Sequence, residues 1–267
     1  MGCGLYCGKK GIEMKICSKL HQIKIEFNVT PKVERFVYVY VILGKYCYLI
    51  DSGVVGSEEI IIEFLKKQGR DVEDIKGIFL THAHPDHIGS AATLKKMSGC
   101  KIYASQSERD WIEHIDQTVT DGDEIFLEEG LTIKVYETAG QSLESMSYYL
   151  VDKKALFVGD SIPLRRDIPI YIDKEKSIET LNRIKDIDGV EYYCPAWDQV
   201  YEEKEGIEAI DFAINYLEEI DECIKSVLRD YPDMTEEGKF EIISESLNMN
   251  EFTNNPLFKE SIMSNLQ

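Results

Sequence analysis

The chain has 267 residues, enough for one large domain or two small ones whose buried core needs no disulfide bonds. It carries 30 Lys and Arg against 49 Asp and Glu, a formal net charge of −19, which argues against a nucleic-acid or anionic-membrane surface because such surfaces bind clustered basic residues. Seven scattered cysteines without a CxxC pair, together with no signal-peptide pattern, lead us to expect a cytoplasmic protein with reduced thiols.

The N-terminal part of the chain has the composition of β-strands. We expect residues 1–20 to form a leader, and Cys3, Cys7 and Cys17 within it either bind nothing or form a metal or redox site. β-branched and aromatic residues then predict strands at residues 21–29, 35–44 and 45–53. The Gly44–Lys45 step predicts a turn between antiparallel strands.

The middle of the chain alternates between segments whose apolar residues have helical spacing and short apolar runs that are typical of strands. Helical spacing predicts helices at residues 57–70, 86–97, 107–115 and 177–188. Short apolar runs predict strands at residues 76–84, 101–105, 125–130, 131–138, 145–152, 154–161 and 190–196. This order predicts an α/β domain of two sheets with helices outside them, spanning residues 21–200.

Residues 201–267 differ from the rest of the chain. Apolar residues at helical spacing predict one long helix over residues 202–230, ended by Pro232, and shorter helices over 235–247 and 255–266. This segment holds 17 acidic and 5 basic residues. We expect a helical C-terminal extension, serving as a lid, a packed cap or a homodimer contact.

Three of the five histidines fall within six residues. His82 and His84 are two positions apart, so in an extended segment their side chains point the same way, and Asp86 and His87 follow at a turn. Imidazole and carboxylate donors converging from one loop are what a zinc-type divalent ion prefers. The cluster therefore predicts a metal site.

The same residues carry a family resemblance. The run THAHPDHIGS (residues 81–90) resembles the signature of the metallo-β-lactamase-fold superfamily, and the resemblance extends over roughly residues 20–200. Further landmarks are LIDSG at 49–53, DGDEI at 121–125 and FVGDS at 157–161. The resemblance implies a four-layer αββα sandwich in which Asp160 bridges two metal ions and Asp86 orients the attacking water or removes its proton.

Two positions depart from the family pattern. Gln141 stands where the resemblance implies a histidine ligand, and Trp197 stands where it implies another. The amide oxygen of Gln141 is a harder donor than imidazole, and an indole does not coordinate at all. Asp198 follows Trp197 as a candidate replacement ligand or substrate contact. We expect weakened binding of one or two divalent ions, zinc first, with iron or manganese as alternatives.

The resemblance implies a metal-dependent hydrolase that acts on a small ester, thioester, lactone or phosphoester by means of a metal-activated water. We expect a small-molecule substrate and no nucleic-acid or membrane partner. An alternative is a catalytically weakened family member that binds a metal or ligand and acts through its helical tail, and an iron protein that handles oxygen or electrons is a third reading. The departures at Gln141 and Trp197 favour the alternative, whereas His82, His84, Asp86, His87 and Asp160 favour the enzyme.

Overall fold

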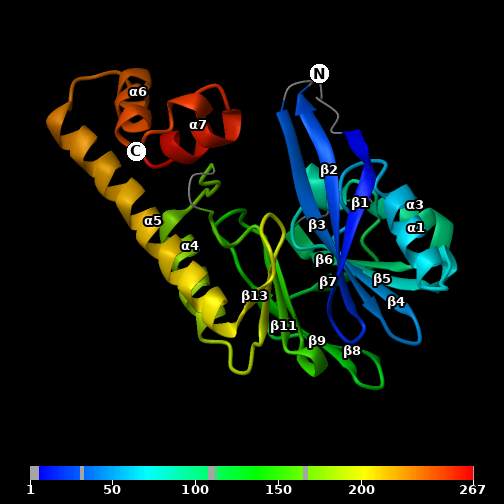
Figure 1. The fold of residues 1–267 in the computed structure, drawn as a ribbon. Coiled ribbons are helices and arrows are strands. Elements are labelled where there is room, and N and C mark those ends of the chain that lie inside the picture. Colours follow the sequence, from blue (N-terminus) through cyan, green and yellow to red (C-terminus); the bar gives the residue numbers. More distant parts are fainter. Residues whose placement is uncertain (1–5, 31–32, 108–111, 113, 165–167, 267) are drawn as a thin grey trace. The chain divides into compact units, whose positions relative to one another are not determined.

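The structure is a computed structural model that describes residues 6–30, 33–107, 112, 114–164 and 168–266. The chain divides into two compact units. The first unit (residues 1–137, 144–159 and 189–201) holds both β-sheets and the helices α1 to α3, and the second (residues 138–143, 160–188 and 202–267) holds α4 to α7 (Figure 1).

The strands of the first unit form two sheets. The first sheet has the strand order β1–β2–β3–β4–β5–β6–β7, and the second has the order β13–β12–β11–β10–β9–β8. The strands are β1 (Tyr6–Cys17), β2 (Leu20–Thr30), β3 (Val33–Leu43), β4 (Cys47–Ile50), β5 (Ile75–Phe79), β6 (Lys101–Ser105), β7 (Gln117–Val119), β8 (Glu124–Glu128), β9 (Leu131–Glu137), β10 (Met146–Leu150), β11 (Ala155–Gly159), β12 (Tyr192–Pro195) and β13 (Tyr201–Glu202).

Strand direction changes within each sheet. In the first sheet each pair of neighbouring strands from β1 to β4 is antiparallel, and each pair from β4 to β7 is parallel. The predicted turn at Gly44 is confirmed, since Leu43 pairs with Cys47 in antiparallel register. In the second sheet β11 and β12 are parallel neighbours. The carboxyl ends of β11 and β12 therefore lie at one edge, which is where α/β folds commonly place ligands.

Two hydrophobic cores explain these layers. Between the sheets, Tyr40 and Phe79 of the first sheet pack in one cluster with Tyr148 and Phe157 of the second. On the other face of the first sheet, Phe64 of α1 (Glu58–Lys67) lies in a second cluster that also contains Leu94 of α3 and buried residues of β2, β3 and β5. The first unit is thus layered as helices, sheet and sheet, and the predicted α/β fold with two sheets is confirmed.

Some elements differ from the sequence-based expectation. Residues 1–20, expected to be a leader, contribute β1, which pairs with β2 in antiparallel register with a shift between Cys7 and Gly11. The helix expected over residues 86–97 is two helices, α2 (Pro85–Ile88) and α3 (Ala91–Ser98). The chain bends between them because Gly89 donates to the carbonyl of Gly53, and a Cβ at Gly89 would lie 2.4 Å from the Val54 backbone.

A few predicted features fall on residues outside the description. The helix expected over residues 107–115 lies largely there, as does Cys3. Cys17 ends β1, and its thiol points to the carbonyl of Ser18 at 3.8 Å. Its pKa is raised, mainly by burial, so the thiol is not activated as a thiolate.

The second unit is helical, as its apolar spacing predicted. Its helices are α4 (Lys174–Lys185), α5 (Glu203–Asp230), α6 (Glu236–Ser246) and α7 (Pro256–Met263). Asp173, Thr235 and Asn255 cap the starts of α4, α6 and α7 by accepting backbone N–H bonds. Among the described residues, no helix is both long and apolar enough to cross a lipid bilayer.

Candidate metal centre

The histidine loop, residues 80–88, runs from the end of β5 through α2 and is hydrogen-bonded to the second sheet. The Met146 amide of β10 donates to the carbonyl of Thr81 at 2.8 Å. The hydroxyl of Tyr148, also on β10, donates to the carbonyl of Leu80 at 2.7 Å. These bonds hold the start of the loop between the two sheets.

The conformation of the loop follows from its sequence. Pro85 is the first residue of α2, and a residue that precedes proline is pushed into extended backbone. His84 accordingly has φ −65° and ψ 146°. The imidazole rings of His82 and His84 lie with their centroids 4.4 Å apart, and those of His82 and His87 lie 4.1 Å apart. The loop thus gathers three imidazoles into one small volume.

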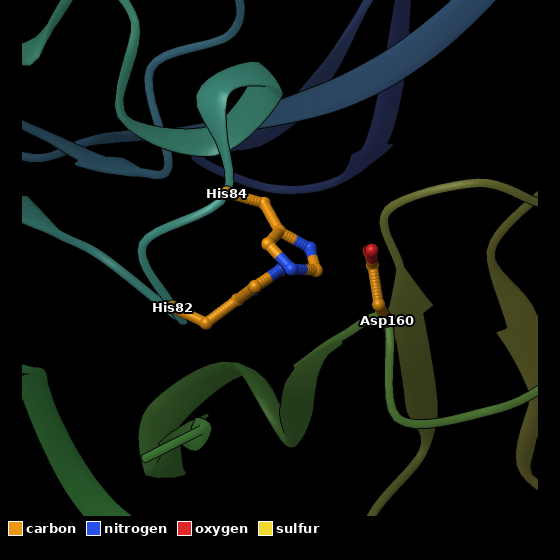
Figure 2. A group of neighbouring side chains, drawn as sticks. All are labelled: His82, His84 and Asp160. Atoms are coloured by element: carbon orange, nitrogen blue, oxygen red, sulfur yellow. The ribbon is translucent and has the colours of Figure 1, made fainter. Parts of the chain in front are cut away.

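A carboxylate supplies the third donor of a possible ligand group. Asp160 directly follows Gly159, the last residue of β11, and its carboxylate faces the imidazoles of His82 and His84 (Figure 2). One ligand atom from each of these three residues lies within 4.8 Å of the other two. Two imidazoles and a carboxylate form a donor set that suits zinc and similar ions, so the residues present fit a divalent metal.

Glycine at position 159 permits this approach. Gly159 has φ +53°, and a Cβ there would lie 2.8 Å from the hydroxyl oxygen of Thr81. A side chain at this position would therefore push the end of β11 away from the histidine loop.

Burial keeps His82 in the form that binds metals. Its side chain is buried, and its pKa lies well below the usual range, chiefly because of desolvation and further because of His87 and His84. The Thr81 hydroxyl donates its proton to the Asp51 carboxylate, so it accepts a bond from Nδ1–H of His82 at 3.1 Å. This tautomer leaves Nε2 of His82 with a lone pair that could coordinate a metal ion.

Asp51 fixes the histidine loop by hydrogen bonds, although its sequence context did not single it out as a site residue. It follows β4 with φ +61°, and its buried carboxylate accepts from the Thr81 amide at 2.8 Å and from Nδ1 of His87 at 2.8 Å. The signal in the sequence was the LIDSG run, where an acid follows a buried apolar strand.

Asp86 and His87 lie beside each other on α2. Oδ2 of Asp86 is 3.5 Å from Nε2 of His87, and both side chains are buried. Burial raises the pKa of Asp86, but His87 and His84 lower it by more, so the pKa lies below its usual value. Asp86 is thus ionised at neutral pH and can accept a proton or a hydrogen bond.

Gln141 lies in a buried turn of the second unit. The amide of Gly140 donates to the carbonyl of Ser142, and the carbonyl of Gly140 accepts from Ile172, so the turn is held on both sides. Gln141 itself is 5% exposed. Its role as a ligand remains a prediction.

Trp197 packs against the first sheet. Its ring lies 6.4 Å from the rings of Phe27 and Phe36, and the guanidinium of Arg35 lies 5.6 Å above it. The neighbouring Asp198 accepts bonds from the Gln199 amide and the Tyr201 hydroxyl, which hold its carboxylate within its own turn.

One protein-family model matches the part of the chain that contains this site. The model of the metallo-beta-lactamase superfamily matches residues 33–197, more than half of the chain. That span includes the histidine loop and every other site residue except Asp198.

Curated relatives are similar over part of their length. Hydroxyacylglutathione hydrolase from Rhodopseudomonas palustris (strain BisB5) is 37% identical over 102 residues, which are 38% of this chain and 38% of the relative. The protein of the same name from Rhizobium etli is 40% identical over 106 residues, 40% of each chain. The chain thus spans about two fifths of the length of these relatives.

Solved structures are similar over more of the chain. A metallo-beta-lactamase family protein from Thermus thermophilus has a TM-score of 0.72 at 16% identity, covering 94% of this chain and 93% of that one. A metallo-beta-lactamase from Pontibacter korlensis has a TM-score of 0.67 at 16% identity, covering 78% and 99%. At such low identity the likeness establishes the fold alone.

Proposed function

Because this chain belongs to the metallo-beta-lactamase superfamily, we propose that it is a metal-dependent hydrolase of a small carbonyl ester, with a thioester as the first candidate. The observation that carries the proposal is the group formed by His82, His84 and Asp160, whose ligand atoms lie within 4.8 Å of one another. We propose zinc as the ion, since two imidazoles and a carboxylate are typical zinc ligands.

The chain's own residues divide the remaining work. When bound, a divalent ion lowers the pKa of water and polarises a substrate carbonyl. Burial keeps His82 neutral and therefore able to coordinate. Asp86, ionised and buried beside His87, accepts the proton of the attacking water. Asp51 holds the side chains of Thr81 and His87 in orientation.

The choice of a thioester rests on the relatives. Those with 37% and 40% identity are named hydroxyacylglutathione hydrolase, and their similarity covers about two fifths of the chain. In thioester hydrolysis the water oxygen adds to the carbonyl carbon, the carbon–sulfur bond breaks, and a carboxylic acid and a thiol are released. Oxygen esters, lactones and phosphoesters use the same group of residues and remain in the test panel.

A second candidate function has its own support. Gln141 and Trp197 replace two residues that the family pattern gives as histidines, and such replacement favours a family member with weakened catalysis. Such a protein would bind a metal or ligand and act through the helices of its C-terminal segment. Hydrolysis assays distinguish the two candidates.

The test compares wild-type protein with Asp86→Ala and Asp160→Ala on thioester, oxygen-ester, lactone and phosphoester substrates, with metal content measured in each sample. We expect metal-dependent thioester hydrolysis, reduced about 100-fold or more in both variants. Asp211→Asn is the matched control, because this carboxylate is half-exposed on α5 and pairs with Lys185. A metal-loaded wild type that hydrolyses no substrate in the panel would overturn the enzyme proposal in favour of the binding protein.

A further inference from the structure

The possible metal donors of the site fall into two sets, one with three donors and one with two. His82, His84 and Asp160 form a group of three within 4.8 Å, whereas Asp86 and His87 lie outside that group. A second ion beside Asp86 and His87 would therefore need further donors. The family resemblance points to the segment after β12 as their source.

That segment lies next to Asp160 in the fold. β11 and β12 are parallel neighbours, and the Ala196 amide donates to the carbonyl of Gly159 at 2.9 Å. Asp160 and Trp197 each follow one partner of this bond by a single residue. Position 197 is thus at the correct end of the second sheet to supply a ligand, but an indole has no lone pair to offer.

The side chain of Trp197 is committed to packing. Phe27 and Phe36 lie against it, and Arg35 lies over its face in cation–π geometry. Its indole nitrogen is buried, with no hydrogen-bond acceptor within reach among the described residues. These contacts favour a packing role over a polar one.

Asp86 and His87 can offer one ligand atom each, and the remaining donor of the segment after β12 is held in its own turn. Nδ1 of His87 is bonded to Asp51, and its Nε2 faces Asp86 at 3.5 Å. The carboxylate of Asp198 accepts from Gln199 and from Tyr201 in its own turn. The segment after β12 therefore adds no ligand to the pair formed by Asp86 and His87.

We propose that this chain holds a single divalent ion, bound by His82, His84 and Asp160, and that Trp197 is the residue that prevents a second ion from binding at Asp86 and His87. The inference rests on the proposed function for its metal site, and it adds the number of ions and the residue that sets it. Asp86 is then free of metal and available to water and substrate.

Metal stoichiometry tests the inference without any assay of catalysis. The whole chain is stripped with a chelator, equilibrated with excess zinc, desalted and analysed by inductively coupled plasma mass spectrometry. We expect one equivalent of zinc in the wild type, two in Trp197→His and one in the matched control Trp197→Phe. Two equivalents in the wild type, or a folded Trp197→His with one, would overturn the inference.

Two further variants locate the retained ion and keep the test valid if Trp197→His does not fold. His84→Ala is expected to lose the ion, while Asp86→Asn is expected to keep one equivalent. Loss of the ion in Asp86→Asn, or its retention in His84→Ala, would contradict the assignment. A single ion without hydrolysis of any substrate in the panel would contradict the proposed function alone, and two ions with hydrolysis would contradict this inference alone.

Discussion

Charged groups around the histidine loop differ in burial from those in the C-terminal helices. Beside the loop, Asp51 is 3% exposed, His87 is fully buried, and each is fixed by short hydrogen bonds. In the C-terminal segment, Glu237 and Lys259 form an ion pair in which the side chains are 60% and 41% exposed. Buried polar groups must be hydrogen-bonded to be tolerated, whereas exposed pairs contribute about 0–1 kcal/mol. We therefore expect substitutions to be costly around the loop and mild in the helices.

The largest expected effect comes from removing a donor of the metal group. His82→Ala should abolish retention of the ion and reduce hydrolysis about 100-fold or more, because a buried ligand is lost from a group of three. His21→Ala is the matched control, since His21 lies on β2 against Phe64 and should leave metal content unchanged. Elemental analysis and initial rates measure both, and a metal-loaded His82→Ala protein would refute the assignment.

The next largest effect is expected from substitution of Asp51, whose carboxylate is bonded to the histidine loop. Asp51→Asn replaces an acceptor of bonds from Thr81 and His87 with an amide that also donates. We expect zinc affinity to fall about 10–100-fold and the free energy of unfolding to fall by about 2 kcal/mol. Competition with a coloured chelator and denaturant unfolding measure the two quantities. Unchanged affinity would show that Asp51 supports the fold without tuning the metal group.

A pair of glycines separates backbone strain from crowding at the loop. Gly99 and Gly159 both have positive φ, but a Cβ at Gly99 meets nothing within 4 Å, whereas one at Gly159 meets Thr81 at 2.8 Å. Gly99→Ala should cost about 1 kcal/mol from strain alone. Gly159→Ala should cost about 2–3 kcal/mol and also weaken zinc binding. Equal losses in denaturant unfolding, with equal zinc affinity, would contradict a close approach of β11 to the loop.

The smallest effect is expected in the C-terminal segment and depends on pH. Burial raises the pKa of Asp221, but the bonds from Lys174 and Lys225 lower it by more, so the folded-state pKa is depressed. The pairs therefore stabilise the protein above the unfolded pKa of about 3.9, and this contribution is lost as pH falls through the folded pKa. Asp221→Asn should cost about 0.5–1 kcal/mol at pH 7 and nothing at pH values below the folded pKa. Thermal unfolding at both pH values measures the difference, which should not grow on acidification.

Much of the fold could be predicted from local periodicity. The alternation of β2 and β3 and the helical spacing of α5 are properties of short segments, because each buries one face. β1 and β7 were missed for the same reason. β1 is Gly-rich at its start and largely exposed where its burial is described, while β7 has three residues, so neither carries a strong local pattern.

The candidate site also contains some residues that are close in sequence and others that are far apart. His82, His84, Asp86 and His87 are close in sequence, so their type and spacing alone predicted a metal-binding loop. Asp51 is 36 residues from His87, and its contact with Nδ1 exists because β4 and β5 are parallel neighbours whose ends meet. No spacing rule in a single sequence reports that contact.

By itself the sequence determined the α/β class, the course of most strands and helices, and the identity of the donors in the histidine loop, since these depend on residues a few positions apart. The tertiary structure decided that Asp160 faces His82 and His84, that Asp51 holds Thr81 and His87, and that Trp197 packs on Phe27 and Phe36. Those relations join residues far apart in the chain. They arise only when strand ends are brought together by sheet pairing and by burial of the core between the sheets.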